Sequence, residues 1–204
     1  MFTSTQPCLI LSPARTGSTA LADYIAEKFY NNAPVLDHPN CITDADVLVG
    51  RSHELYDSGV LNQFMVIFNI RESIVDTVVS RIIANHYEIW NWPESKPESF
   101  KPFIADLVQV GHATDQQMAW YEHYVQFLTP LSHVVSYEVY TEIIPLPIWE
   151  KLSKDLVSNL EEVIHHIESL LTDSFKSAHG TFVDWKTLPN RSKIYLELQG
   201  HNLN

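Results

Sequence analysis

Short apolar runs alternate with longer segments of helical apolar spacing along this chain, and this alternation constrains the fold more than any other feature. The runs cover residues 7–11, 46–49, 64–70 and 133–137. Apolar runs without a polar face are typical of strands buried on both sides of a parallel sheet. The sequence therefore predicts an α/β protein with parallel strands.

The segments between these runs predict helices. We expect the first helix to begin near Gly17 and to end before the turn-rich residues 31–34. A second helix is expected to follow Ser73, whose hydroxyl suits an N-cap, and to pack its apolar face on the sheet. Longer helical patterns cover residues 103–128 and 149–171.

Length and composition predict one domain over residues 1–204, because a chain with 45% hydrophobic residues can bury one core. Residues 91–102 contain three prolines and no clear period, which predicts a loop at about residues 90–102, either a lid or an exposed linker. No apolar run is long enough to span a membrane, and the N-terminus does not resemble a signal peptide. We expect a soluble, cytoplasmic protein with no membrane partner.

The charge of the chain excludes some partners. Its net charge is −12, with 13 Lys and Arg against 25 Asp and Glu, which argues against a nucleic-acid partner. An anionic ligand would have to be held by a local group of cations. No HExxH or CxxC spacing indicates a metal site, and Cys8 and Cys41 are expected to be reduced thiols.

The turn after the first apolar run has the composition of a phosphate-binding loop. Gly17 allows close approach of the backbone, and the helix that follows offers free N–H groups to an anion. Aligned with the nucleotide-binding pattern GxxxxGK[ST], Ser12 and Gly17 take the glycine positions and Thr19 the hydroxyl position. Ser18 replaces the lysine, and Arg15 at the tip supplies a cation able to grip phosphate oxygens bidentately.

The sequence "ARTGST" of residues 14–19 resembles the donor-binding loop of sulfotransferases that use 3′-phosphoadenosine 5′-phosphosulfate (PAPS), in its arginine version. The resemblance implies a P-loop NTPase-like sulfotransferase fold, a three-layer arrangement with a mostly parallel sheet flanked by helices. It also implies that the 5′-phosphosulfate binds to the loop, through Arg15, Thr16, Gly17, Ser18 and Thr19. No metal is required for this chemistry.

A second segment, "FMVIFNIRESIVDTVVS" of residues 64–80, resembles the 3′-phosphate motif of the same family and implies that Arg71 and Ser80 bind this phosphate. Ser80 lies two helical turns past Ser73, roughly 10 Å along the axis, so Arg71 and Ser80 can reach one phosphate from two sides. The commoner family pattern has one residue fewer between them. Near the C-terminus, Arg191 and Lys193 are further candidates for this phosphate, or are solvated surface charges.

A third segment, "VLVGRSHEL" of residues 47–55, resembles the strand of the family that ends in Lys-Thr-His, which makes His53 the first candidate for the general base. A neutral imidazole, with a pKa of about 6.5, can take the acceptor's proton. Asp37, after the first helix, is the alternative base. In "HVVSYEVY", residues 133–140, Tyr137 either stacks on the adenine or packs in the core.

The reaction implied by the resemblance is in-line transfer of a sulfuryl group from PAPS to a hydroxyl or amine of a small molecule or glycan, with adenosine 3′,5′-bisphosphate (PAP) as product. Arg15 and the loop amides would stabilise the charge that develops on the bridging oxygen. Two alternatives stay open, a P-loop small-molecule kinase and a non-catalytic nucleotide-binding α/β protein.

Overall fold

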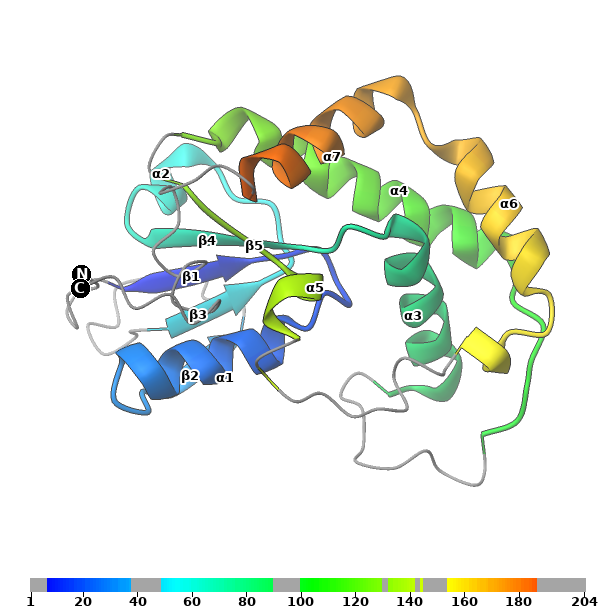
Figure 1. Cartoon of the computed structure of the whole chain (residues 1–204), viewed down its shortest axis with the longest axis horizontal. Coiled ribbons are helices and arrows are strands. Elements are labelled where there is room, and N and C mark those ends of the chain that lie inside the picture. Colours follow the sequence, from blue (N-terminus) through cyan, green and yellow to red (C-terminus); the bar gives the residue numbers. More distant parts are fainter. Residues whose placement is uncertain are drawn as a thin grey trace.

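The sheet in the computed structural model is parallel in every described pairing, with the strand order β2-β3-β1-β4-β5 (Figure 1). The structure describes residues 7–37, 49–89, 100–129, 132–141, 144 and 154–186, with side chains up to residue 184. The strands are β1 (Cys8–Leu11), β2 (Val35–Asp37), β3 (Val49–Ser52), β4 (Met65–Ile70) and β5 (His133–Ser136). The predicted α/β class with parallel strands is confirmed.

Two strands differ from the sequence-based expectation. Residues 46–48 of the strand expected at 46–49 lie outside the described residues, and β3 continues to Ser52 because Gly50 to Ser52 pair with Leu9 to Leu11 of β1 although they are not an apolar run. Strand β2 was not predicted. It has three residues and partly exposed side chains, so its sequence lacks the apolar run of a buried strand.

Helices cover both faces of the sheet. Cys8 and Ile10 of β1 pack with α1 (Ser18–Phe29) and α5 (Tyr137–Tyr140) on one face. Leu9 and Leu11 face the opposite core, which is built by α3 (Ile74–Tyr87), α4 (Leu107–Tyr124), α6 (Leu160–Leu170) and α7 (Asp173–Lys186). The short helices α2 (Ser58–Leu61) and η1 (Val125–Phe127) complete the described elements.

Helix α3 lies beyond the carboxyl ends of the strands instead of across the sheet (Figure 1). Ser73 caps it as predicted, since its Oγ accepts a hydrogen bond from the Asp76 N–H at 3.1 Å. Its apolar face packs chiefly against α4 and α6, which corrects the expectation that it packs on the sheet. This position brings the polar face of α3 to the carboxyl edge of the sheet.

The two long predicted helices begin later than expected. Phe103 pairs with Val157 in an isolated bridge, and α4 starts only at Leu107 with Asp106 as its cap. Residues 154–156 form one 3₁₀ turn, and α6 starts at Leu160. The Asn159 amide group bonds to the N–H (2.8 Å) and the carbonyl (3.1 Å) of Ala105, so the two segments are tied to each other before their helices begin.

Helix α7 was not predicted, since its sequence carries few apolar positions. Phe175, Ala178 and Phe182 nevertheless bury its inner face against Tyr121 and Phe68. Among the described helices, including α7, none has the length and apolar content to cross a membrane.

Candidate functional site at the carboxyl ends of the strands

Four of the segments singled out in the sequence follow the carboxyl ends of strands. The loop of residues 12–17 follows β1, and His53, Arg71 and Tyr137 follow β3, β4 and β5. The chain after β1 leads to β2 on one side of the sheet, whereas the chain after β4 leads to β5 on the other. Ligands of open α/β sheets bind at such a divergence. The ends of β1 and β4 are therefore the favoured position for a ligand.

The loop of residues 12–17 is held in place through its carbonyl oxygens. Every carbonyl from residue 12 to residue 16 accepts a hydrogen bond from a side chain. The donors are, in order, His53 Nδ1 (2.9 Å), Thr16 Oγ1 (3.0 Å), Gln117 Nε2 (3.2 Å), the Arg71 guanidinium (3.3 Å) and Asn69 Nδ2 (3.0 Å). In a trans peptide the following N–H points the opposite way. Each N–H from residue 14 to residue 17 thus points away from the side chain that holds the carbonyl before it.

Gly17 is required at the end of the loop for two reasons. Its φ is +70°, in the left-handed region, and a Cβ added there would overlap Tyr140 Oη. The Tyr140 hydroxyl donates a hydrogen bond to the Thr16 carbonyl. Gly17 is also the N-cap of α1 and makes no side-chain cap, so the first N–H groups of α1 lack the partners that a capping side chain would give.

The predicted hydroxyl ligands of the loop differ in their placement. The Thr16 side chain is fully buried, where Oγ1 donates to the Pro13 carbonyl and accepts from Asn69 Nδ2 at 3.2 Å. Ser18 is also buried. Only the backbone of Thr16 is therefore suited to meet a ligand, whereas Thr19 and Arg15 are partly exposed at the end of α1 and in the loop.

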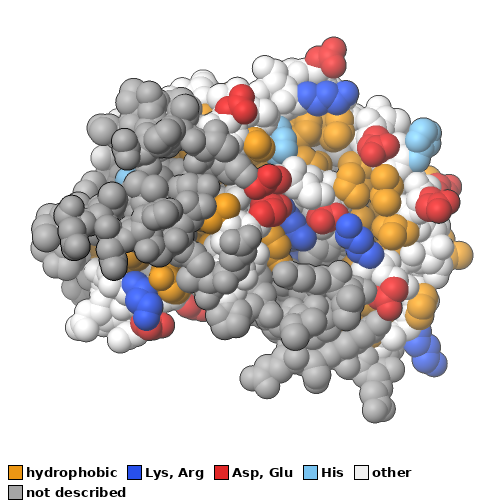
Figure 2. All heavy atoms as spheres, in the orientation of Figure 1, with side chains coloured by type: hydrophobic (Ala, Val, Ile, Leu, Met, Phe, Trp, Pro, Cys, Tyr) orange, Lys and Arg blue, Asp and Glu red, His pale blue; other side chains and the backbone are white. Residues whose placement is uncertain are grey.

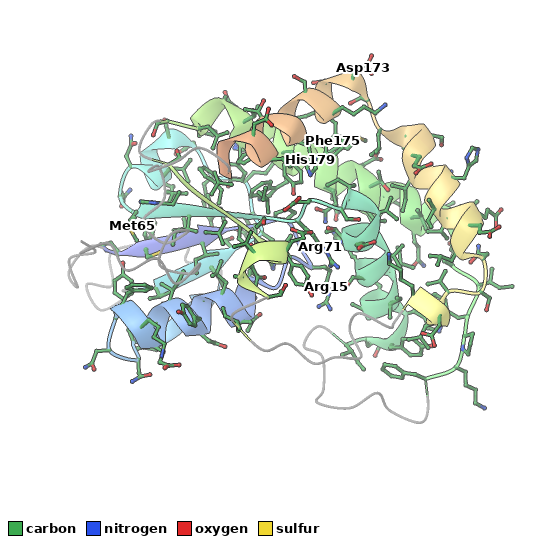
Figure 3. The ribbon with its side chains drawn as sticks, viewed as in Figure 1. Arg15, Met65, Arg71, Asp173, Phe175 and His179 are labelled. Atoms are coloured by element: carbon green, nitrogen blue, oxygen red, sulfur yellow. The ribbon has the colours of Figure 1, made fainter. Side chains whose placement is uncertain are left out.

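Arg71 is a nearly buried cation with its main chain and its side chain both fixed. Its carbonyl accepts hydrogen bonds from Tyr121 Oη (3.2 Å) and His179 Nε2 (3.1 Å). Its guanidinium lies 4.3 Å from the centre of the Tyr137 ring and donates to the Arg15 carbonyl. Arg15 and Arg71 thus lie close together, with His179 of α7 above them in the view of Figure 3.

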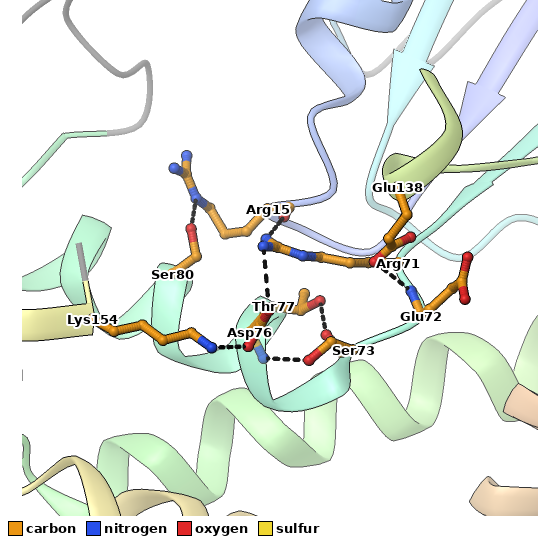
Figure 4. A network of polar contacts seen from close by, with 9 residues as sticks. All are labelled: Arg15, Arg71, Glu72, Ser73, Asp76, Thr77, Ser80, Glu138 and Lys154. Carbon is orange, nitrogen blue, oxygen red and sulfur yellow. Dashed lines mark hydrogen bonds and ion pairs between the residues drawn. The ribbon is translucent and has the colours of Figure 1, made fainter. Parts of the chain in front are cut away.

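Arg15 connects the loop to helix α3. Its backbone is left-handed (φ +70°), and its Nε donates a hydrogen bond to Ser80 Oγ at 3.3 Å (Figure 4). The sequence predicts one anion site at the loop and a second one at Arg71 and Ser80. The structure brings Arg15, Arg71 and Ser80 together, so the two expected sites adjoin through the Arg15 side chain.

Lys154 and Asp76 belong to the same network, although the sequence analysis did not select them as site residues. Lys154 Nζ lies 2.5 Å from Asp76 Oδ1, and an Arg71 nitrogen lies 3.9 Å from Asp76 Oδ2. Cationic side chains from three segments thus converge on the polar face of α3 in a chain of strongly negative net charge. Lys or Arg and Asp or Glu side chains also lie close together in the middle of the face shown in Figure 2.

The two candidate bases lie in different environments. His53 Nδ1 is 2.9 Å from the Ser12 carbonyl, and because a carbonyl only accepts, Nδ1 carries the proton. Nε2 of the neutral imidazole then holds the lone pair that a general base needs. Asp37 instead forms an ion pair with Arg51, which donates to it at 2.8 Å, and its side chain is 55% exposed. The geometry favours His53 over Asp37 as the base.

Tyr137 packs in the core, which is the second of the two alternatives that its sequence allows. Its ring is 5% exposed, lies edge-on to Tyr140 and is covered by Arg71. The neighbouring Glu138 accepts the Glu72 N–H at 3.0 Å, and burial raises the pKa of the Glu138 carboxyl above its ordinary value. Tyr137 and Glu138 thus support the turn that carries Arg71.

Some residues of this site could not be found from sequence spacing. Asn69, Gln117 and Tyr140 bond to the loop from elements far along the chain, and Lys154 pairs with Asp76 of α3. Conversely, the predicted cations Arg191 and Lys193 lie outside the described residues, so their predicted role stays a prediction.

Comparisons with family models, with curated proteins and with solved structures find no match for this chain. Within the part of the chain that the structure describes, no group of three or more His, Cys, Asp or Glu side chains is arranged to hold a metal. The assignment of a function therefore depends on the geometry of the site and on the motifs of the sequence.

Proposed function

We propose that this protein is a sulfotransferase that moves a sulfuryl group from PAPS to a hydroxyl or amine of an acceptor. The observation that carries the proposal is the convergence of Arg15, Arg71 and Ser80 beside a loop whose carbonyls from residue 12 to residue 16 all accept hydrogen bonds from side chains. A loop of this kind offers N–H groups and cations to an anion but no competing carbonyl oxygens.

The residues present fit a ligand with two anionic groups. The loop amides, the start of α1 and Thr19 would hold the 5′-phosphosulfate, with Arg15 at the tip of the loop. Arg71 and Ser80 would hold the 3′-phosphate. Because the Arg71 guanidinium is stacked on Tyr137 and its main chain is clamped by Tyr121 and His179, this cation is already oriented before a ligand arrives.

The chain's own groups account for the proton and charge of the transfer. His53 Nε2 would take the proton from the acceptor's hydroxyl while the acceptor oxygen bonds to sulfur. The bond between sulfur and the bridging phosphate oxygen breaks, and Arg15 with the loop amides stabilises the negative charge that remains on that oxygen. The products are the sulfated acceptor, PAP and a proton on His53.

The test separates this proposal from the two alternatives. We expect PAPS and PAP to bind with and without Mg²⁺, and ATP to bind more weakly, because Ser18 stands where a P-loop kinase has its lysine. Calorimetry with the three nucleotides measures this order. Tighter binding of ATP with Mg²⁺ would indicate a kinase. PAPS binding with no transfer to any alcohol, phenol, sugar or amine of a broad panel would indicate a non-catalytic protein.

A further inference from the structure

Asp76 lies where two cations of the proposed phosphate site meet. Its carboxylate contacts Lys154 closely, at 2.5 Å, but reaches Arg71 only at 3.9 Å (Figure 4). It stands on the turn of α3 that precedes Ser80, so it shares the face of the helix that Arg15 reaches. An anionic side chain thus stands among the cations that a phosphate would need.

Asp76 is not the group that holds Arg71 in position. The Arg71 guanidinium bonds to the Arg15 carbonyl and stacks on Tyr137, and the Arg71 main chain is fixed by two side chains of α4 and α7. A contact of 3.9 Å adds little to these restraints. Loss of the Asp76 charge should therefore leave Arg71 where it is.

Lys154 is held near this site by its backbone. It begins the 3₁₀ turn of residues 154–156, where its carbonyl accepts the Val157 N–H at 3.1 Å. The next residues are tied to Phe103, whose N–H donates to the Leu156 carbonyl and whose carbonyl accepts the Ser158 N–H, both at 2.8 Å. The Lys154 side chain itself is 46% exposed, so it can exchange one anionic partner for another.

We propose that Lys154 is a third cation of the phosphate site and that Asp76 is its counter-ion in the unliganded protein, displaced when a phosphate group binds. This inference rests on the proposed function, in which Arg71 and Ser80 hold a phosphate. A phosphate carries more negative charge than a carboxylate and offers more acceptor oxygens, so it binds Lys154 and Arg71 together. The remaining Asp76 charge then repels the ligand and limits its affinity.

The proposal predicts opposite effects of two substitutions. Asp76→Asn should tighten PAP binding about fivefold because it removes a like charge beside the phosphate. Lys154→Met should weaken PAP binding about fivefold, and both effects should shrink at high salt because the pair is partly exposed. If Asp76 served only to hold Arg71 or to stabilise the start of α3, Asp76→Asn would weaken binding.

Calorimetry on both variants, with PAP and with inorganic pyrophosphate as probes, decides between these roles. Asp115→Asn on α4 and Lys176→Met on α7 are matched controls, since both residues are exposed and carry the same charges. Two results would overturn this inference and leave the proposed function standing, provided that the wild type binds PAP. They are an unchanged affinity of Lys154→Met for PAP and a weaker affinity of Asp76→Asn for PAP.

The other outcomes are equally distinct. The wild type could bind pyrophosphate but not PAP, with tighter pyrophosphate binding by Asp76→Asn and weaker binding by Lys154→Met. This result would support the counter-ion role of Asp76 and contradict the proposal that the ligand is PAPS or PAP. Binding of neither probe by the wild type would overturn both proposals.

Discussion

The Arg71 guanidinium donates a hydrogen bond to the carbonyl oxygen of Arg15 at 3.3 Å, which joins the turn after β4 to the loop after β1. These two arginines are 56 positions apart in sequence. The bond has two consequences. It orients the Arg71 side chain toward the loop, and it gives the Arg15 carbonyl oxygen a donor within the protein.

Gly17 should be essential for this loop, and Gly180 should not. Replacing Gly17 by Ala places a Cβ in overlap with Tyr140 Oη at a φ of +70°, and we expect the free energy of unfolding to fall by about 2 kcal/mol. A Cβ at Gly180 of α7 meets nothing within 4 Å, so Gly180→Ala should raise that free energy by up to about 1 kcal/mol. Urea denaturation measures both changes.

An unfolding free energy of Gly17→Ala within about 0.5 kcal/mol of the wild type would contradict the close packing of Tyr140 over the loop.

His53 and Asp37 should differ in their effect on transfer. The amide of His53→Asn can still donate to the Ser12 carbonyl but provides no lone pair at the Nε2 position, so we expect transfer to slow at least about 100-fold. PAP affinity should change little. Asp37→Asn should keep most of the activity, because Asp37 is paired with Arg51. Rates of sulfate transfer measured with one acceptor test this, and a larger loss in Asp37→Asn would reverse the assignment.

The buried carboxyl of Glu138 should make the free energy of unfolding depend on pH. Burial raises the pKa of this carboxyl in the folded protein above its unfolded value, so the folded state binds more protons in the window between the two values. Its contribution to stability therefore falls as the pH rises through that window. In Glu138→Gln the charge is gone, while the side-chain oxygen can still accept the Glu72 N–H.

We expect Glu138→Gln to match the wild type below pH 4.5, the ordinary pKa of a glutamate, and to be the more stable protein at pH 8. Urea denaturation of both proteins at several pH values checks this. A difference in stability that is constant across the pH range would show that the Glu138 pKa is not raised.

Local features of the fold were predictable because they depend on residues close in sequence. The apolar runs of β1, β4 and β5 and the cap at Ser73 are examples. Strand β2 was missed because an exposed edge strand needs no apolar run, and α7 was missed because three apolar side chains suffice to bury its inner face. Their stability comes from contacts with distant elements, which a local pattern does not contain.

The residues of the candidate site also differ in whether the sequence alone could predict them. The motifs around Arg15, His53 and Arg71 are short segments, each at the end of a strand, so a parallel sheet brings them to one edge. In contrast, nothing near Asn69 or Gln117 in the sequence indicates that their side chains hold the loop carbonyls. These contacts depend on the packing of β4 and α4, which only the three-dimensional structure defines.

The central claim is that Arg71 and the loop of residues 12–17 bind the two phosphates of one nucleotide, and titration calorimetry with PAP tests it most directly. The account predicts micromolar binding by the wild type and at least tenfold weaker binding by Arg71→Ala, about 1.4 kcal/mol. Lys28→Ala, an exposed cation of α1 paired with Glu27, should bind as the wild type does. Equal affinities of Arg71→Ala and the wild type for PAP would contradict the claim.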